Sequence, residues 1–191
     1  MIEERTNCEN LHVLLGVTGA IAARCAIDLA SMLTCAGAAV KTVMTENACQ
    51  FVMPKSFEAV TNSSVYTSMW TGCEEFKIEH INLADWADII VVAPATANII
   101  GKIANGICDN LLSSILCACW QKPVLIAPAM NTNMWNNPAV QQNIKVLCAR
   151  GVELIGPETG RLACGTKGIG KMSLPQDILE RIKQIAANLT R

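Results

Sequence analysis

The chain alternates short runs of apolar residues with longer stretches in which apolar positions recur at helical spacing. The short runs are apolar at consecutive positions, so we expect strands that are buried on both faces. The expected strands are His12–Val17, Ala39–Met44, Ser64–Ser68, Ile89–Ala93, Val124–Ala127 and Val152–Ile155. The expected helices are Ala20–Ala36, Thr96–Ala104, Asn110–Trp120, Pro138–Arg150 and Pro175–Asn188. This alternation predicts an α/β fold with a parallel sheet covered by helices.

The composition favours one domain with a large core. The chain has 191 residues, of which 51% are hydrophobic, and contains no repeat or low-complexity linker. We therefore expect residues 1–191 to form a single domain. The Gly-rich segment 156–170 interrupts the alternation, and a long loop of this kind in a compact domain is usually functional.

Charge and cysteine usage exclude several classes of partner. The net charge is -1, and Lys and Arg are scattered without a basic run, so we expect no nucleic acid partner. No apolar run is long enough to span a bilayer, so we expect no membrane insertion, and the apolar excess favours a homo-oligomer. No signal-like segment precedes Leu11, which predicts a cytoplasmic protein whose ten cysteines are free thiols. Cys117 and Cys119 lie too close for a zinc pair, and no metal is expected.

Polar residues follow three of the expected strands where each strand ends. The first strand turns at Gly16-Val-Thr-Gly19, which is compatible with a phosphate cradle and equally with a tight turn that holds no ligand. The second ends at Thr45, and the fourth is followed by Thr96-Ala-Asn98. This convergence predicts a mononucleotide site. Because no acidic residue is placed to hold an adenosine ribose, FMN is favoured over a nicotinamide dinucleotide.

Three further residues are candidates for chemistry. Asn131 ends the apolar run that begins at Pro123, where it would fix a substrate or merely cap the following helix. His80 precedes the fourth strand and is either an acid/base group or a surface residue at a helix entry. Cys164 lies in the Gly-rich segment, where it is either a reactive thiol or an incidental one. These alternatives stay open at the level of single residues.

Four motifs considered together resemble the homo-oligomeric flavin-containing cysteine decarboxylases. They are His80-Ile-Asn-Leu-Ala-Asp-Trp-Ala-Asp, Pro94-Ala-Thr-Ala-Asn, Gly106-Ile-Cys-Asp-Asn-Leu-Leu and Pro128-Ala-Met-Asn-Thr-Asn-Met-Trp. The resemblance extends from about Val13 to the last helix, although residues 63–79 match poorly. It implies a three-layer Rossmann-like flavoprotein fold with a six-stranded parallel sheet in the order 3-2-1-4-5-6. It also implies bound FMN and trimers, or a dodecamer of trimers, with active sites between protomers.

The resemblance implies a role for each matching residue. The implied cofactor-binding residues are Gly19, Ala20, Ile21, Thr45, Thr96, Ala97, Asn98, Ile99 and Ala129. The implied substrate-binding residues are Met130, Asn131, Met134, Ala163 and Cys164, with residues 156–172 as a clamp over a small-molecule substrate. The implied catalytic residues are His80, Asn131 and Cys164.

The segment Ala163-Cys-Gly-Thr-Lys-Gly-Ile-Gly favours one branch of this family. That branch decarboxylates 4′-phosphopantothenoylcysteine to 4′-phosphopantetheine in coenzyme A biosynthesis. Oxidation of the cysteine by FMN gives a thioaldehyde that accepts the electrons of decarboxylation, and the resulting ene-thiol is then reduced. In that scheme His80 moves a proton, Asn131 orients the substrate and Cys164 protonates the ene-thiol. The alternatives are decarboxylation of a peptidyl C-terminal cysteine and a non-catalytic flavin-binding regulatory subunit.

Overall fold

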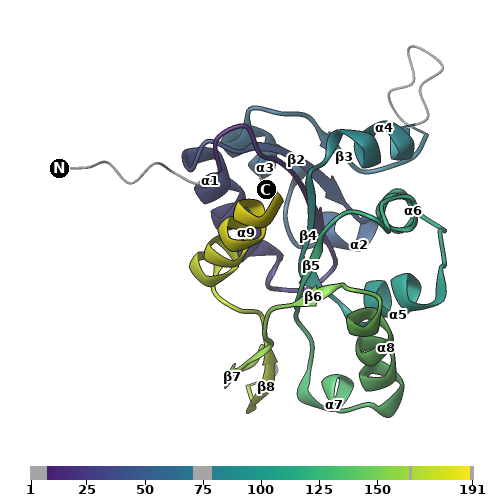
Figure 1. The fold of residues 1–191 in the computed structure, drawn as a ribbon. Helices are drawn as coiled ribbons and strands as arrows, with labels where there is room; N and C mark the ends of the chain where they lie inside the picture. Colours follow the sequence, from purple (N-terminus) through teal and green to yellow (C-terminus); the bar gives the residue numbers. More distant parts are fainter. Residues whose placement is uncertain (1–7, 71–78, 164, 190–191) are drawn as a thin grey trace.

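The computed structural model describes residues 8–70, 79–163 and 165–189, which form three layers with a sheet in the middle (Figure 1). The sheet consists of β1 (His12–Val17), β2 (Ala39–Met44), β3 (Val65–Tyr66), β4 (Ile89–Ala95), β5 (Val124–Pro128) and β6 (Glu153–Leu154). Its order is β3-β2-β1-β4-β5-β6, and every pair is parallel. The predicted six-stranded sheet and its order 3-2-1-4-5-6 are confirmed.

Helices cover both faces of the sheet. Residues of α1 (Ala23–Cys35), α3 (Pro54–Thr61) and α9 (Pro175–Leu189) join the hydrophobic cluster on one face. Residues of α4 (Glu79–Trp86), α5 (Ala97–Asn105), α6 (Leu111–Ala118) and α8 (Pro138–Ala149) join the cluster on the other. Two single-turn helices, α2 (Glu46–Cys49) and α7 (Thr132–Trp135), follow β2 and β5. The sequence pattern did not predict these two helices, α3 or α4, because one or two turns are too short to show a clear helical period.

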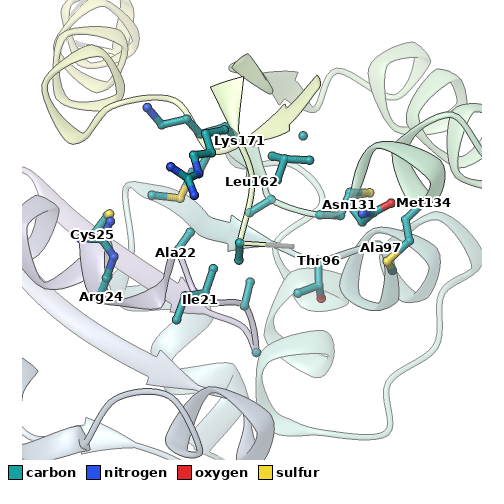
Figure 2. Close-up of a pocket in the computed structure, with 18 residues that line it drawn as sticks. Ile21, Ala22, Arg24, Cys25, Thr96, Ala97, Asn131, Met134, Leu162 and Lys171 are labelled. Carbon is teal, nitrogen blue, oxygen red and sulfur yellow. The ribbon is translucent and has the colours of Figure 1, made fainter. Parts of the chain in front are cut away.

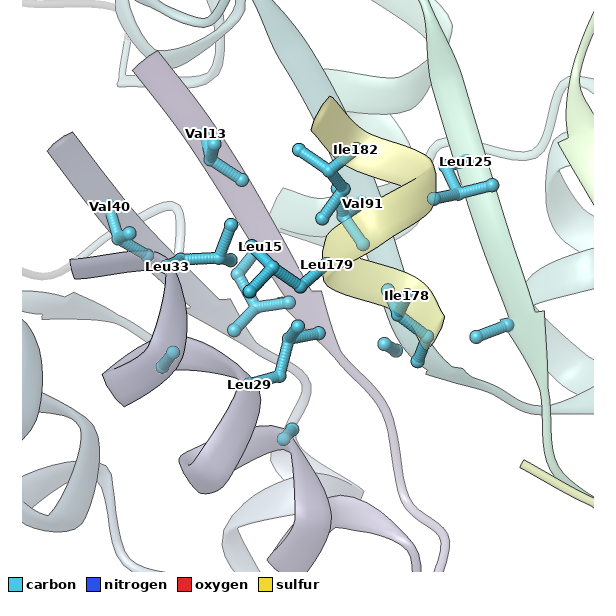
Figure 3. Close-up of a cluster of buried hydrophobic side chains, with 14 of the residues drawn as sticks. Val13, Leu15, Leu29, Leu33, Val40, Val91, Leu125, Ile178, Leu179 and Ile182 are labelled. Carbon is cyan, nitrogen blue, oxygen red and sulfur yellow. The ribbon is translucent and has the colours of Figure 1, made fainter. Parts of the chain in front are cut away.

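Alternation along β1 explains why the strand is apolar throughout. Val13 and Leu15 pack with Leu29 of α1 and Ile182 of α9 (Figure 3), whereas Leu14 belongs to the cluster on the opposite face. All of these side chains are fully buried, and each contributes about 1.5–3 kcal/mol to stability. Because the strands are parallel, this packing also holds their carboxyl ends at one edge of the sheet.

Two segments differ most from the expected elements. α1 begins at Ala23 instead of Ala20, because the chain first makes a turn in which the Ala20 N–H donates to the Thr18 carbonyl at 2.9 Å. The segment expected as a loop at 156–170 contains an antiparallel hairpin of β7 (Glu158–Arg161) and β8 (Lys167–Lys171). Across the described ranges, none of the helices combines the length and apolarity needed to cross a membrane.

Candidate functional site

A cavity of about 720 Å³ opens at the carboxyl edge of the sheet (Figure 2). Its walls come from the turn after β1, the start of α5, the segment after β5, and the β7–β8 hairpin. The lining residues are Gly19, Ala20, Ile21, Ala22, Arg24, Cys25, Thr96, Ala97, Ala129, Met130, Asn131, Met134, Arg161, Leu162, Ala163, Gly170, Lys171 and Met172. The cavity is therefore built from segments that are far apart in the sequence.

A second cavity of about 450 Å³ shares part of this wall. Gly19, Thr96, Ala97 and Met134 line both cavities. The other residues of the second cavity are Thr18, Thr45, Glu46, Asn47, Asn98, Ile99, Lys102, Asp109 and Asn110. The two cavities thus form adjoining parts of one site.

The second cavity contains its own ion pair. The Lys102 ammonium donates to both carboxylate oxygens of Asp109 at 2.8 Å. This hydrogen bonding holds the pKa of the Asp109 carboxyl below its ordinary value. Asp109 therefore stays ionised and its charge is matched by Lys102.

Asn131 is both a helix cap and a cavity residue. Its side-chain oxygen accepts a hydrogen bond from the Asn133 N–H at 2.8 Å, which caps α7. Asn131 also lines the first cavity. A carboxamide has several hydrogen-bonding positions, and the cap uses its oxygen. The two interpretations of this residue are compatible.

The β7–β8 hairpin is attached to the segment that carries Asn131. The Met130 N–H donates to the Gly170 carbonyl at 3.0 Å, and the Thr132 hydroxyl donates to the Ile169 carbonyl at 2.8 Å. A Cβ on Gly170 would overlap the Met130 carbonyl oxygen, and one on Gly168 would overlap the Thr132 hydroxyl. Glycine at both positions therefore allows β8 to lie directly against this segment.

Hydroxyl caps position the helices that border the site. The Thr96 hydroxyl accepts from the Ile99 N–H at 3.5 Å and caps α5. The Thr45 hydroxyl accepts from the Ala48 N–H at 3.3 Å and caps α2. In contrast, α1 has no side-chain cap at Ala22, and the Ala23 and Cys25 N–H groups of its first turn donate to the backbone carbonyls of Ala20 and Ala22.

The structure gathers most of the expected site residues. Gly19, Ala20, Ile21, Thr96, Ala97, Ala129, Met130, Asn131, Met134 and Ala163 line the first cavity, and Thr45, Asn98 and Ile99 line the second. Cys164 lies outside the described residues. His80 is on α4 and lines neither cavity. One chain therefore does not bring His80 and Asn131 together.

Several lining residues were not expected from the sequence. Thr18 is 2% exposed and bridges the ends of β1 and β4. Arg24, Arg161 and Lys171 bring positive charge to the first cavity, and of these Arg161 and Lys171 belong to the segment 156–172 that was expected as the substrate clamp. The only sequence signal for Arg24 was its position at the start of the helix that follows the Gly19 turn. The signal for Arg161 was its nearness to Cys164 in the chain.

Comparison with known proteins identifies the family. The family model described as Flavoprotein matches residues 1–187. The chain belongs to the flavoprotein family. It is 50% identical over 171 residues to the coenzyme A biosynthesis bifunctional protein CoaBC of Bacillus subtilis (strain 168). That match covers 90% of this chain and 42% of the relative, so the flavoprotein chain spans less than half of the relative's length.

Solved structures agree with this assignment. A PPC decarboxylase cysteine-to-serine mutant complexed with pantothenoylaminoethenethiol has a TM-score of 0.86 and 37% identity, covering 92% of this chain and 98% of that one. The FMN binding protein AtHal3 has a TM-score of 0.85 and 37% identity, covering 94% and 98%. The resemblance of this flavoprotein to the flavin-containing cysteine decarboxylases is confirmed.

Proposed function

We propose that this flavoprotein binds FMN and decarboxylates 4′-phosphopantothenoylcysteine to 4′-phosphopantetheine, a step of coenzyme A biosynthesis. The proposal rests on the position of Asn131, which lines a cavity bordered by the β7–β8 hairpin at the carboxyl edge of the sheet. Two relatives support the choice of substrate, one named for coenzyme A biosynthesis and one complexed with pantothenoylaminoethenethiol.

The chemistry of the two cavities fits FMN. Ile21 and Met130 give the first cavity apolar walls suited to a flavin ring, and Thr45 and Thr96 add hydroxyls to the second. We assign to FMN the residues Gly19, Ala20, Ile21, Thr45, Thr96, Ala97, Asn98, Ile99 and Ala129. Bound FMN would supply hydride transfer from and back to the substrate cysteine.

The chain's own residues orient the substrate and move protons. The Asn131 amide would hydrogen-bond the substrate carboxylate and amide, so that the bond to carbon dioxide is held in a reactive geometry. Ala163, Met130 and Met134 would enclose the cysteine end and exclude water. Cys164 would protonate the ene-thiol formed by decarboxylation, so that the released product is saturated.

We propose that residues 156–172 act as the substrate clamp of a single domain formed by residues 1–191. Hydrogen bonds from Met130 and Thr132 to β8 support this role, because they connect the hairpin to the Asn131 segment. Replacing Cys164 with Ser tests its role directly. Release of unsaturated ene-thiol is expected, and an unchanged saturated product would exclude Cys164 as the proton donor.

We propose that the active protein is a cytoplasmic homo-oligomer, either a trimer or a dodecamer that is built from trimers. Within one chain His80 lines neither cavity, so its proposed proton transfer requires the cavity of a neighbouring copy. The side chains of Ile21, Met134 and Ile107 are 55%, 49% and 48% exposed, which supports burial of this region between copies.

The deciding experiment is incubation of the purified holoprotein with 4′-phosphopantothenoylcysteine. Carbon dioxide release is followed by mass spectrometry together with the flavin absorption spectrum. Formation of saturated 4′-phosphopantetheine is the expected result. Turnover of peptides that end in cysteine, with no turnover of the pantothenoyl substrate, would favour the peptide branch. Bound FMN without turnover of either would favour a regulatory flavin-binding subunit.

A further inference from the structure

Positive charge in the first cavity comes from three separate elements. Arg24 lies on α1, Arg161 on β7 and Lys171 on β8, and all three line the cavity. No aspartate or glutamate lines this cavity among the residues that the structure describes. The first cavity therefore presents one sign of charge, which focuses its field on an anion.

Among the residues that the structure describes, no carboxylate forms an ion pair with these side chains. Within the described part of the chain, none of the ion pairs involves Arg24, Arg161 or Lys171. Glu158 lies opposite Lys171 in the hairpin register, but its carboxylate accepts a hydrogen bond from the Ser173 hydroxyl at 3.0 Å. Like charges brought together without partners are unfavourable unless an anion joins them. Their arrangement thus favours binding of an anionic ligand.

The cavity is also polarised along its length. Figure 2 shows Arg24 and Lys171 on one side of the pocket and Asn131 and Met134 on the other. A ligand that reaches both sides needs a group for the carboxamide at one end and an anion at the other. Guanidinium groups pair with phosphate oxygens in bidentate fashion, and three cations match the charge of a phosphomonoester dianion better than that of a single carboxylate.

We propose that Arg24, Arg161 and Lys171 form a subsite for the phosphomonoester end of the substrate. The inference rests on the proposed function, since it assumes that the cysteine end lies at Asn131. It goes further by assigning the selection of phosphorylated over unphosphorylated pantothenoylcysteine to these three cations. FMN also carries a phosphomonoester, so the test must separate the substrate phosphate from the cofactor phosphate.

The test compares Arg24→Gln, Arg161→Gln and Lys171→Gln holoproteins with the wild type. Each is assayed with 4′-phosphopantothenoylcysteine and with pantothenoylcysteine, and its FMN content is measured. We expect KM for the phosphorylated substrate to rise roughly ten- to a hundredfold, because hydrogen bonds between charged groups are lost. We expect KM for the unphosphorylated substrate to change much less, because that substrate has no phosphate contact to lose, and we expect FMN content to be retained. Lys145→Gln, which removes an exposed cation of α8 outside the cavity, is the matched control.

Calorimetric binding of 4′-phosphopantothenate and pantothenate to the same holoproteins gives a second readout that needs no turnover. A selective loss of affinity for the phosphorylated compound supports the subsite even if the decarboxylase proposal fails. Equal losses for both compounds would overturn it in favour of a general structural effect. Loss of FMN from the variants would overturn it in favour of a cofactor phosphate site.

Discussion

The Thr18 hydroxyl accepts a hydrogen bond from the backbone N–H of Thr96 at 3.1 Å, although 78 residues separate the two in sequence. The same hydroxyl donates to the Pro94 carbonyl at 2.7 Å. One buried side chain thus joins the end of β1 to the end of β4, where both cavities begin. Small residues around Thr18 leave room for a ligand, and the two hydrogen bonds of Thr18 hold the ends of β1 and β4 together.

Replacing Thr18 with Val should lower the free energy of unfolding by about 1–3 kcal/mol, because a buried donor and a buried acceptor lose their partner. FMN should also bind more weakly, since the Thr96 segment loses its support. Urea unfolding and flavin titration measure the two effects. The matched control is Thr42→Val, because the buried Thr42 hydroxyl has no hydrogen-bond partner within the described residues. Equal destabilisation by both variants would contradict the role of Thr18.

Replacing Asn131 with Asp separates the cap from the substrate contact. A carboxylate still accepts from the Asn133 N–H, and aspartate is a good N-cap, so stability should hardly change. The new negative charge should repel the substrate carboxylate and lower kcat/KM roughly a hundredfold, since opposing like charges cost several kcal/mol.

The control for that variant is Asn137→Asp. Asn137 caps α8 through the Ala139 N–H at 2.9 Å and lies outside both cavities. Steady-state kinetics should show nearly wild-type turnover for the Asn137 variant. Similar kinetics of the two variants would mean that Asn131 acts only as a cap.

Replacing Gly170 with Ala should displace the hairpin, because a Cβ there would overlap the Met130 carbonyl oxygen. We expect a lower free energy of unfolding and a raised KM. Gly151→Ala provides the control, since Gly151 has a φ of +86° but nothing within 4 Å of the added atom. Its cost should be only the backbone strain of about 1–2 kcal/mol. Chemical unfolding and kinetics of both variants give the comparison, and a Gly170 variant with normal KM would argue against the clamp.

Mixing two inactive variants tests whether His80 acts on a neighbouring copy. His80→Asn should lower kcat by about 10²–10⁴, as expected for loss of an acid/base group, and Asn131→Ala should be equally impaired. Mixed oligomers formed by co-expression should regain activity, because some sites then combine an intact His80 with an intact Asn131. Separately purified proteins combined without subunit exchange are the control. Absence of recovery in confirmed mixed oligomers would contradict the proposal that His80 acts at the site of a neighbouring copy.

The strands were predictable because their burial on both faces requires consecutive apolar residues, as in β1 and β4. Short elements were harder to predict, because β3 and α7 contain too few residues to establish a period. The polar residues after the strands were recognisable as site candidates from position alone. The sequence could not decide whether Asn131 caps a helix or lines a ligand site, and the structure shows that it does both.

The sequence by itself determined the parallel sheet, the edge at which the site lies and most of its small and polar walls. The spacing of apolar residues and the types of residue that follow each strand are local properties, so they are visible in the sequence. Only the tertiary structure decided that Arg24, Arg161 and Lys171 face one cavity and that His80 lies outside it. Those relationships depend on how distant elements pack, because side chains that are remote in sequence meet only after the sheet, helices and hairpin are assembled.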